Sequence, residues 1–251
     1  MVDAMENVHE LLGYERIKII QRDDMLRFSL DSMLLADFVD TSKTKETDLV
    51  VDLGTGNAPI PLFLSLKTRA KIFGVDIQSD VCALARKSVE LNNLENQITI
   101  INDNIKDIYK KIGANKFEIV VSNPPYFKYK DTSRINKNDY LTIARHEVLI
   151  TLADIVSEAK KLLVDGGSFY MVHRVERLVD IISTLKDEKF GIKNIRFIYS
   201  KENEENALLV LIHARKNKAS DVKIVKPLYV YDSNGEYTKE VKNIFNFKWI
   251  A

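Results

Sequence analysis

The sequence contains a single cysteine, and this scarcity excludes an intramolecular disulfide. We expect Cys82 to be buried and inert in a reducing compartment. The sequence also lacks any apolar stretch near the roughly 20 residues that a membrane span needs, and no basic-then-apolar leader opens it. These absences predict a cytoplasmic protein without a membrane-spanning segment.

Excess charge of one sign is lacking too. Lys and Arg number 37 against 36 Asp and Glu, which gives a net charge of +1 at pH 7. There is no global basic field, so any binding of nucleic acid must depend on a local patch. The 251 residues are 45% hydrophobic, which is typical of a globular protein. We expect one domain overall, with an N-terminal cap at 1–48, a core at 49–216 and a C-terminal extension at 217–251.

Short apolar runs that meet a polar residue at or next to their end recur along the chain. They cover 49–53, 71–77, 97–103, 117–122 and 168–173. Segments with helical patterning separate several of them, and this alternation predicts an α/β fold whose parallel strands end at one shared edge. Runs at 192–199 and 207–213 predict a closing antiparallel hairpin, and 223–231 alternates like an edge strand.

Further elements are expected outside these runs. Residues 17–21 predict a short strand, and Ser29 or Asp31 can cap a helix that begins near Met33. Additional helices are expected over 59–66, 79–91, 148–163, 176–186 and 238–245. The third of these should end at Asp165-Gly166-Gly167.

The stretch Asn123-Pro124-Pro125-Tyr126 carries the strongest chemical signal. Two prolines cannot continue a strand, and each fixes its own φ, so the turn is stiff before a ligand arrives. The Asn123 amide oxygen and the Pro124 carbonyl can converge on one exocyclic amino group, while the Tyr126 ring offers a face to a flat base. The plainer interpretation is a turn with a chance Asn and Tyr. The turn is predicted to lie at the same sheet edge as the strand-end aspartates, and this position favours the catalytic interpretation.

Two other groups at the predicted edge fit a nucleotide-like ligand. Gly54 and Gly56 allow a ligand to approach the backbone at the start of a helix. Asp76 follows Asp52 at about the interval at which Rossmann-like sheets place a carboxylate on a ribose diol. His173, at the end of the fifth run, is interpreted as structural rather than catalytic.

A basic cluster follows the proline turn, in a polar stretch without periodicity. Its members are Lys128, Lys130, Arg134 and Lys137. They form either a solvated face or a lid that contacts phosphate groups.

The glycine turn lacks the third glycine of the dinucleotide fingerprint. Asp52-Leu53-Gly54-Thr55-Gly56 instead resembles the first motif of class I S-adenosylmethionine-dependent methyltransferases, and Asn123-Pro124-Pro125-Tyr126 strengthens that resemblance. Flanking stretches make the chain similar to the bacterial tRNA1(Val) (adenine(37)-N6)-methyltransferases over nearly its whole length. These stretches are 27–36, 56–62, 74–78, 144–147 and 227–231. The turn departs from the superfamily at Asn57-Ala58-Pro59, where a further glycine is usual.

The resemblance implies a Rossmann-like class I methyltransferase fold, with a seven-stranded, mostly parallel sheet and a C-terminal antiparallel hairpin. It implies N6-methylation of adenine 37 in a valine tRNA, with S-adenosyl-L-methionine as the cofactor. Asn123 and Pro124 would hold the target amino group, Pro125 would stiffen the turn, and Tyr126 would stack on the base. Cofactor contacts are expected from Phe28, Asp31, Asp52, Gly54, Gly56, Asn57, Asp76, Ile77, Asp103, Asn104 and Asn123. Arg145 and His146 would lie near the RNA.

Other functions remain open at this point. Release-factor glutamine methyltransferases share the Asn-Pro-Pro-Tyr letters, and rRNA guanine-N2 methyltransferases use a variant. A non-catalytic RNA-binding protein with the same fold is a third possibility. The mechanism needs no metal, and we expect a monomer or a weak dimer.

Overall fold

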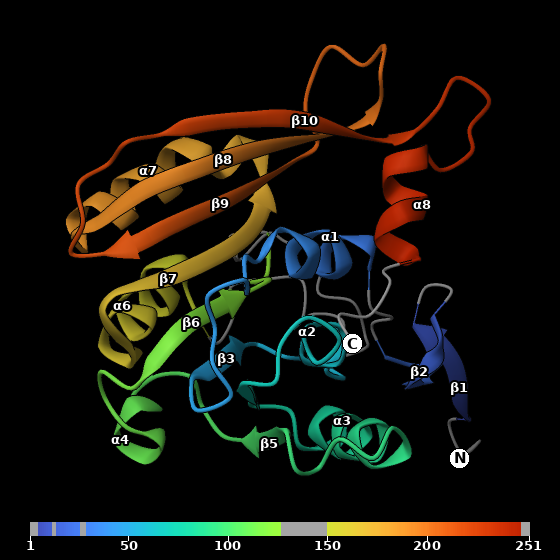
Figure 1. The fold of residues 1–251 in the computed structure, drawn as a ribbon, viewed down its shortest axis with the longest axis vertical. Coiled ribbons are helices and arrows are strands. Elements are labelled where there is room, and N and C mark those ends of the chain that lie inside the picture. The colour runs from blue at the N-terminus through green and yellow to red at the C-terminus, as the bar shows by residue number, and fades with distance from the viewer. Residues whose placement is uncertain (1–4, 12–13, 26–28, 127–149, 247–251) are drawn as a thin grey trace, which may run out of the picture.

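The computed structural model describes residues 5–11, 14–25, 29–126 and 150–246. An eight-stranded sheet forms its centre, in the order β10-β8-β9-β7-β6-β3-β4-β5 (Figure 1). Its strands are β3 (Leu49–Leu53), β4 (Lys71–Asp76), β5 (Ile98–Asn102), β6 (Phe117–Ser122), β7 (Leu163–Arg174), β8 (Phe190–Lys201), β9 (Leu209–Lys216) and β10 (Lys223–Tyr231). The helices are α1 (Leu30–Phe38), α2 (Pro59–Leu64), α3 (Ser79–Leu91), α4 (Tyr109–Ile112), α6 (Leu152–Leu162), the 3-10 turn η1 (Val175–Arg177), α7 (Leu178–Asp187) and α8 (Lys239–Phe245).

The sheet is mostly parallel, as expected. Strands β3 to β7 run parallel to one another, while β9 is antiparallel to both β7 and β8. The expected hairpin is therefore confirmed. The sheet has eight strands rather than seven because β10 adds to β8 in parallel at the edge. The register of this pair shifts between Val225 and Leu228, where Pro227 cannot donate a ladder hydrogen bond.

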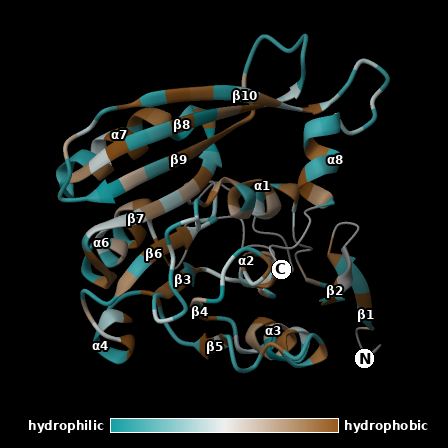
Figure 2. Cartoon of the chain, in the orientation of Figure 1, coloured by the Kyte–Doolittle hydropathy of each residue, from teal (hydrophilic) through white to brown (hydrophobic). Residues whose placement is uncertain are grey.

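Alternation along the strands builds a core on each face of the sheet. Val50 and Val121 point into the cluster that α1, α2, α3 and α8 cover, whereas Val51 and Val120 point into the cluster that α4, α6 and α7 cover. The hydrophobic colouring of the central strands in Figure 2 reflects this two-sided burial. Parallel strands that are buried on both faces leave their ends as the place for polar side chains.

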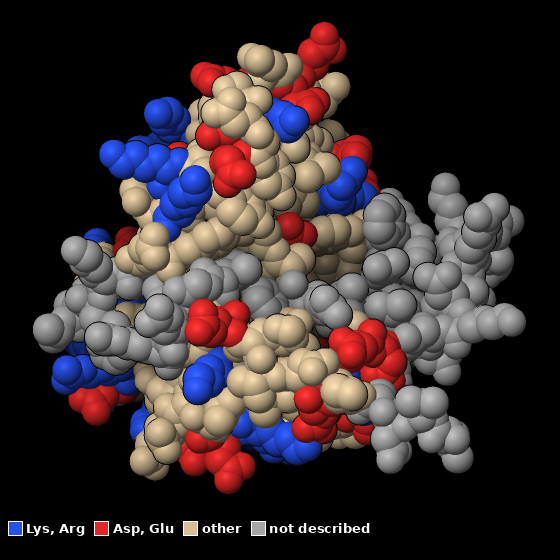
Figure 3. Space-filling model, turned by 90° about the vertical axis from the view of Figure 1, so that its right-hand side faces the viewer, with Lys and Arg blue, Asp and Glu red and all other residues tan. Residues whose placement is uncertain are grey.

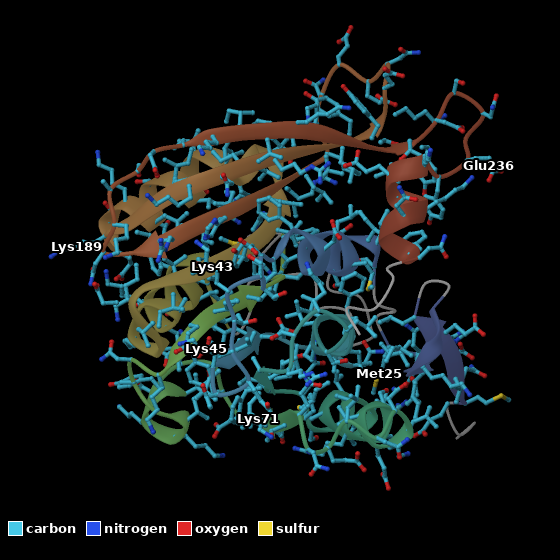
Figure 4. The ribbon with its side chains drawn as sticks, viewed as in Figure 1. Met25, Lys43, Lys45, Lys71, Lys189 and Glu236 are labelled. Carbon is cyan, nitrogen blue, oxygen red and sulfur yellow. The ribbon has the colours of Figure 1, made fainter. Side chains whose placement is uncertain are left out.

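A separate two-stranded hairpin lies against α3, formed by β1 (Glu6–Leu11) and β2 (Tyr14–Arg22). Side chains of α3 and of its C-cap residue, Asn92, complete the free edge of β2. Ser88 Oγ accepts from the Ile20 amide at 2.9 Å, and Asn92 exchanges hydrogen bonds with both backbone groups of Lys18, at 2.9 and 2.7 Å. Beyond β2, Met25 packs on the first half of α3 (Figure 4). The strand over 17–21 is confirmed, and its partner β1 was not expected.

One expected helix boundary is wrong. The chain after Lys161 leaves the helix at Leu162, and β7 begins at the next residue. Asp165-Gly166-Gly167 therefore lies within β7, where the register against β6 shifts, and does not follow the helix end. Gly166 has φ of +72°, so it serves a bulge instead of a helix cap. The start of the helix is fixed by Thr151, which forms a capping box with Asp154.

Candidate active site

The predicted convergence of strand ends is present in the structure. In the ladder, Asp52 pairs with Gly74 on one side and Val121 on the other, and Asp76 pairs with Asn102. The turn that begins at Asn123 follows β6 directly. These side chains therefore lie along one edge of four adjacent parallel strands, the position at which doubly wound sheets bind ligands.

The glycine turn after β3 is held by the neighbouring strand. The amides of Gly54 and Thr55 both donate to the Val75 carbonyl, at 2.9 and 3.0 Å. Gly54 and Gly56 have φ of +79° and +56°, and a Cβ atom built on either would meet nothing within 4 Å. Glycine is needed here for its backbone conformation, and the turn is open on the side that faces away from the sheet.

Asp52 is fully buried, and both of its carboxylate oxygens lack a hydrogen-bond partner among the described residues. Burial raises the pKa of Asp52 to about 7; the Thr55 hydroxyl opposes this change, and the charge of Asp76 adds to it. The Thr55 hydroxyl is also buried; it lies close enough to Asp52 to affect the carboxyl pKa but forms no hydrogen bond of ordinary geometry. Buried acceptors without donors are rare in folded proteins, and these point to a ligand that brings donors or positive charge.

Asp76 is bonded to the backbone around it. Its carboxylate accepts from the Gly56 amide at 2.9 Å and from the Gln78 amide at 3.0 Å, and so ties the glycine turn to the start of α3. Burial raises the pKa of Asp76, while these backbone donors oppose the change. Ile77, the next residue, is 39% exposed and offers an apolar surface beside the carboxylate. The ribose contact proposed for Asp76 stays a prediction.

The third strand end is more open than the first two. The Asp103 amide donates to the Asp76 carbonyl at 3.0 Å, so the two strand ends are adjacent. The Asp103 carboxylate accepts from Lys111 Nζ at 2.9 Å and from the Asn104 amide at 2.7 Å. The hydrogen bond from Lys111 lowers the pKa of Asp103. Adenine contacts by Asp103 and Asn104 also stay predictions.

The proline turn contacts the first turn of α1. Asn123 Nδ2 donates to Ser32 Oγ at 3.0 Å, and the Tyr126 hydroxyl donates to Asp31 Oδ2 at 2.7 Å. Among the described residues, Asn123 Oδ1 makes no hydrogen bond. Burial raises the pKa of Tyr126 well above its usual range, the Asp31 carboxylate raises it further, and the Asn123 amide, as a hydrogen-bond donor, lowers it.

His173 lies behind the tyrosine, with ring centroids 5.3 Å apart. Its Nδ1 accepts from the Arg174 amide at 2.8 Å, so the neutral ring carries its proton on Nε2. Burial lowers the pKa of His173 to about 4. A neutral ring packed on Tyr126 agrees with the structural role expected for this residue.

Of three residues expected to cap α1 or to bind the cofactor, two make other contacts and one makes no capping hydrogen bond. Ser29 occupies the N-cap position of α1 but its side chain makes no capping hydrogen bond. Asp31 instead serves Tyr126, and Asn57 donates to the Ile20 carbonyl of the hairpin at 3.0 Å. Sequence reasoning missed Ser32 and Thr55, because a lone hydroxyl residue gives no local pattern.

The remaining expected contacts lie outside the described residues. They are Phe28, Lys128, Lys130, Arg134, Lys137, Arg145 and His146. On the face seen in Figure 3, both acidic and basic side chains occur, as the small net charge implies. Within the described ranges, no group of three or more His, Cys, Asp and Glu could hold a metal ion. None of the helices in those ranges is long and apolar enough to cross a membrane.

Comparison with known proteins agrees with this arrangement. Residues 28–191 match the model of the methyltransferase small domain. A tRNA1(Val) (adenine(37)-N6)-methyltransferase from Parabacteroides distasonis is 28% identical over 170 residues, which cover 66% of this chain and 67% of the relative. Among solved structures, a predicted O-methyltransferase from Agrobacterium tumefaciens has a TM-score of 0.68 at 21% identity, covering 86% of this chain and 96% of the other.

A second solved structure shares the fold at greater distance. The geranyl diphosphate C-methyltransferase from Streptomyces coelicolor A3(2), in complex with Mg²⁺, geranyl diphosphate and S-adenosyl-L-homocysteine, has a TM-score of 0.53 at 12% identity. It covers 74% of this chain and 79% of its own. At these identities, the two solved structures establish the fold alone. They confirm the class I methyltransferase fold that the resemblance implied.

Proposed function

Because the chain belongs to the methyltransferase small domain family, we propose that it transfers a methyl group from S-adenosyl-L-methionine to N6 of adenine 37 in tRNA1(Val). The observation that carries this proposal is the position of Asn123-Pro124-Pro125-Tyr126 beside the open glycine turn, at one edge of the parallel sheet. The name of the Parabacteroides distasonis relative supports the choice of substrate.

The unpaired atoms at the strand ends suit this cofactor. Asp52 and Thr55 offer buried acceptors to its ammonium group, and Gly54 and Gly56 leave room for its methionine end against the backbone. When bound, the cofactor supplies a methyl group that a positively charged sulfur activates. We assign the remaining cofactor contacts to Phe28, Asp31, Asn57, Asp76, Ile77, Asp103, Asn104 and Asn123.

The proline turn would act on the target amino group. An amino group conjugated to a purine ring is a poor nucleophile, and the acceptors Asn123 Oδ1 and Pro124 O favour its rehybridisation by accepting from both N–H bonds. The rigidity of the two prolines holds these acceptors in place. The protein needs neither a strong base nor a covalent nucleophile for this step, since its contribution is alignment and exclusion of water.

The RNA has to present its base outside the anticodon-loop stack. Removing a base from a stack costs a few kcal/mol, and contact with the Tyr126 ring would offset part of that cost. We assign phosphate contacts to the basic residues that follow the turn, Lys128, Lys130, Arg134, Lys137, Arg145 and His146. Binding through these cations should weaken as salt rises, because each phosphate contact releases counterions. The N-terminal cap at 1–48 and the C-terminal extension at 217–251 would frame the core at 49–216 in a monomeric or weakly dimeric cytoplasmic enzyme.

The assay that tests the proposal supplies labelled S-adenosyl-L-methionine together with one of three acceptors. These are unmodified tRNA1(Val), ribosomal RNA and a release factor. Label in the tRNA that digests to N6-methyladenosine is the expected result. Label that enters only the release factor, or only guanine of ribosomal RNA, would contradict the substrate while leaving the family unchanged.

A further inference from the structure

Two adjacent residues of α1 form hydrogen bonds with the two polar side chains of the proline turn, Asn123 and Tyr126. Ser32 accepts from Asn123 Nδ2 at 3.0 Å, and Asp31 accepts from the Tyr126 hydroxyl at 2.7 Å. Ser32 is only 6% exposed, so its hydroxyl is removed from competing water. The first turn of α1, which is remote in sequence from Asn123, thus determines how the turn presents its side chains.

Hydrogen-bond polarity fixes the direction of these contacts. An ionised carboxylate only accepts, so the Tyr126 proton points to Asp31 and leaves the phenol oxygen as an acceptor. Asn123 Nδ2 donates to Ser32 at 3.0 Å, and a phenol oxygen that has no proton to offer the amide favours the same NH2 end on its side. The opposite end of the amide, Oδ1, is left for the ligand side.

The orientation matters because the two ends of an asparagine amide are nearly identical in shape and opposite in function. With the oxygen toward the ligand, the site accepts from an amino group. After a 180° flip it would offer an N–H donor, which suits a carbonyl oxygen and repels an amino group. Shape alone does not choose between these states, so the choice depends on the partners of the NH2 group.

We propose that Asp31 and Ser32 are positioning residues that lock the Asn123 amide with its oxygen toward the target base, and so select an amino group over a carbonyl group. This inference rests on the proposed function, because it concerns the base on which that function acts. It gives Asp31 a role in orienting the catalytic turn in addition to the cofactor contact proposed above.

The first test is kinetic, on the full-length protein with tRNA1(Val). Ser32→Ala should lower kcat about five- to tenfold, the effect of losing one hydrogen bond of ordinary strength, with the Kd for S-adenosyl-L-methionine and the KM for tRNA within about twofold of wild type. Ser29→Ala is the matched control on the same helix start, because the Ser29 side chain makes no capping bond. It should leave kcat unchanged. Equal kcat for Ser32→Ala and wild type would overturn the proposal.

The second test measures selectivity by competition. A tRNA that carries inosine at position 37 presents a carbonyl oxygen in place of the amino group. Wild type should bind the adenosine form more tightly than the inosine form, and Ser32→Ala should reduce that ratio. If Ser32 has only a structural role, Ser32→Ala should weaken the binding of both tRNA forms equally, and that result would contradict the proposal. Asp31→Asn changes the acceptor of the Tyr126 hydroxyl and should also reduce the ratio of the two affinities. The test therefore does not depend on one variant.

A third readout does not require activity. In ¹⁵N-labelled protein, the side-chain NH2 signal of Asn123, identified by its loss in Asn123→Asp, should exchange slowly with solvent in wild type and faster in Ser32→Ala. Equal exchange would mean that Ser32 does not hold the amide. If wild type methylates no tRNA, the proposed function fails, whereas this signal still decides whether the lock exists.

Discussion

The side-chain amide of Asn57, in the glycine turn, donates to the backbone carbonyl of Ile20, in the N-terminal hairpin, at 3.0 Å. This bond joins an element that precedes the matched family region to the turn that would hold the cofactor. Asn57 is 8% exposed, so the bond is shielded from water. The hairpin therefore supports the position of the glycine turn.

Asn57→Ala should weaken cofactor binding several-fold, because the turn loses its support from the hairpin. The lost hydrogen bond should cost about 0.5–1.5 kcal/mol of unfolding free energy. Isothermal titration with S-adenosyl-L-methionine and denaturant unfolding measure the two effects. Asn92→Ala is the control, since Asn92 holds the same strand at Lys18 from the far end of α3. It should cost stability while the cofactor Kd stays near the wild-type value.

Asp52→Asn should stabilise the protein without cofactor and abolish cofactor binding. The pKa of Asp52 rises from an ordinary 3.8 to about 7 through burial, so the folded state is penalised by the ionised carboxyl group above that pH. The penalty is present in full above pH 7 and disappears as the pH falls toward 4. Its upper limit is about 4 kcal/mol, at roughly 1.4 kcal/mol per pKa unit. Unfolding of both variants at pH 8 measures the difference. A less stable Asp52→Asn would contradict this account.

Cofactor affinity of the wild type should depend on pH in the range where Asp52 ionises. A protonated carboxyl group is a poorer partner for a cationic ligand, so the Kd should increase by up to about tenfold per pH unit below pH 7 and level off above it. Titrations between pH 5.5 and 8.5 test this. The same titrations with Asp52→Asn should show weak binding without that dependence; an unchanged pH dependence would assign it to another group.

Asn123→Ala should abolish methyl transfer and weaken cofactor binding only a few-fold, since Asn123 is one of several assigned cofactor contacts. Removal of the amide takes away one of the two acceptors proposed for the target amino group, whereas the strand ends at Asp52 and Asp76 are untouched. Filter-bound label after incubation with tRNA measures transfer, and calorimetry measures the cofactor. Turnover at the wild-type rate would exclude the role of Asn123.

The strand ends could be predicted from the sequence because their geometry follows from topology. Asp52, Asp76 and Asn123 each terminate or follow a short apolar run, and parallel strands end at a common edge. That reasoning needs no side-chain detail. The hairpin of β8 and β9 and the edge strand β10 could be predicted as well, because the apolar pattern of each strand is local.

The contacts across the site could not be predicted, because they join segments that are distant in the chain. Nothing in the pattern near Ser32 indicates that it meets Asn123, 91 residues later. Strand β1 was missed because its exposed faces leave Glu6-Asn7-Val8-His9-Glu10 without a regular apolar alternation. The end of α6 was misplaced because glycines at a β-bulge and at a helix cap look alike in sequence.

The most direct test of the central claim uses two transcripts of tRNA1(Val) that differ only at position 37, one with adenine and one with guanine. Each is incubated with the protein and S-adenosyl-L-methionine, and the nuclease fragments are weighed by mass spectrometry. One added methyl group is expected, on the anticodon-loop fragment of the adenine transcript alone. Methylation of both transcripts, or of a fragment elsewhere in the molecule, would contradict the claim.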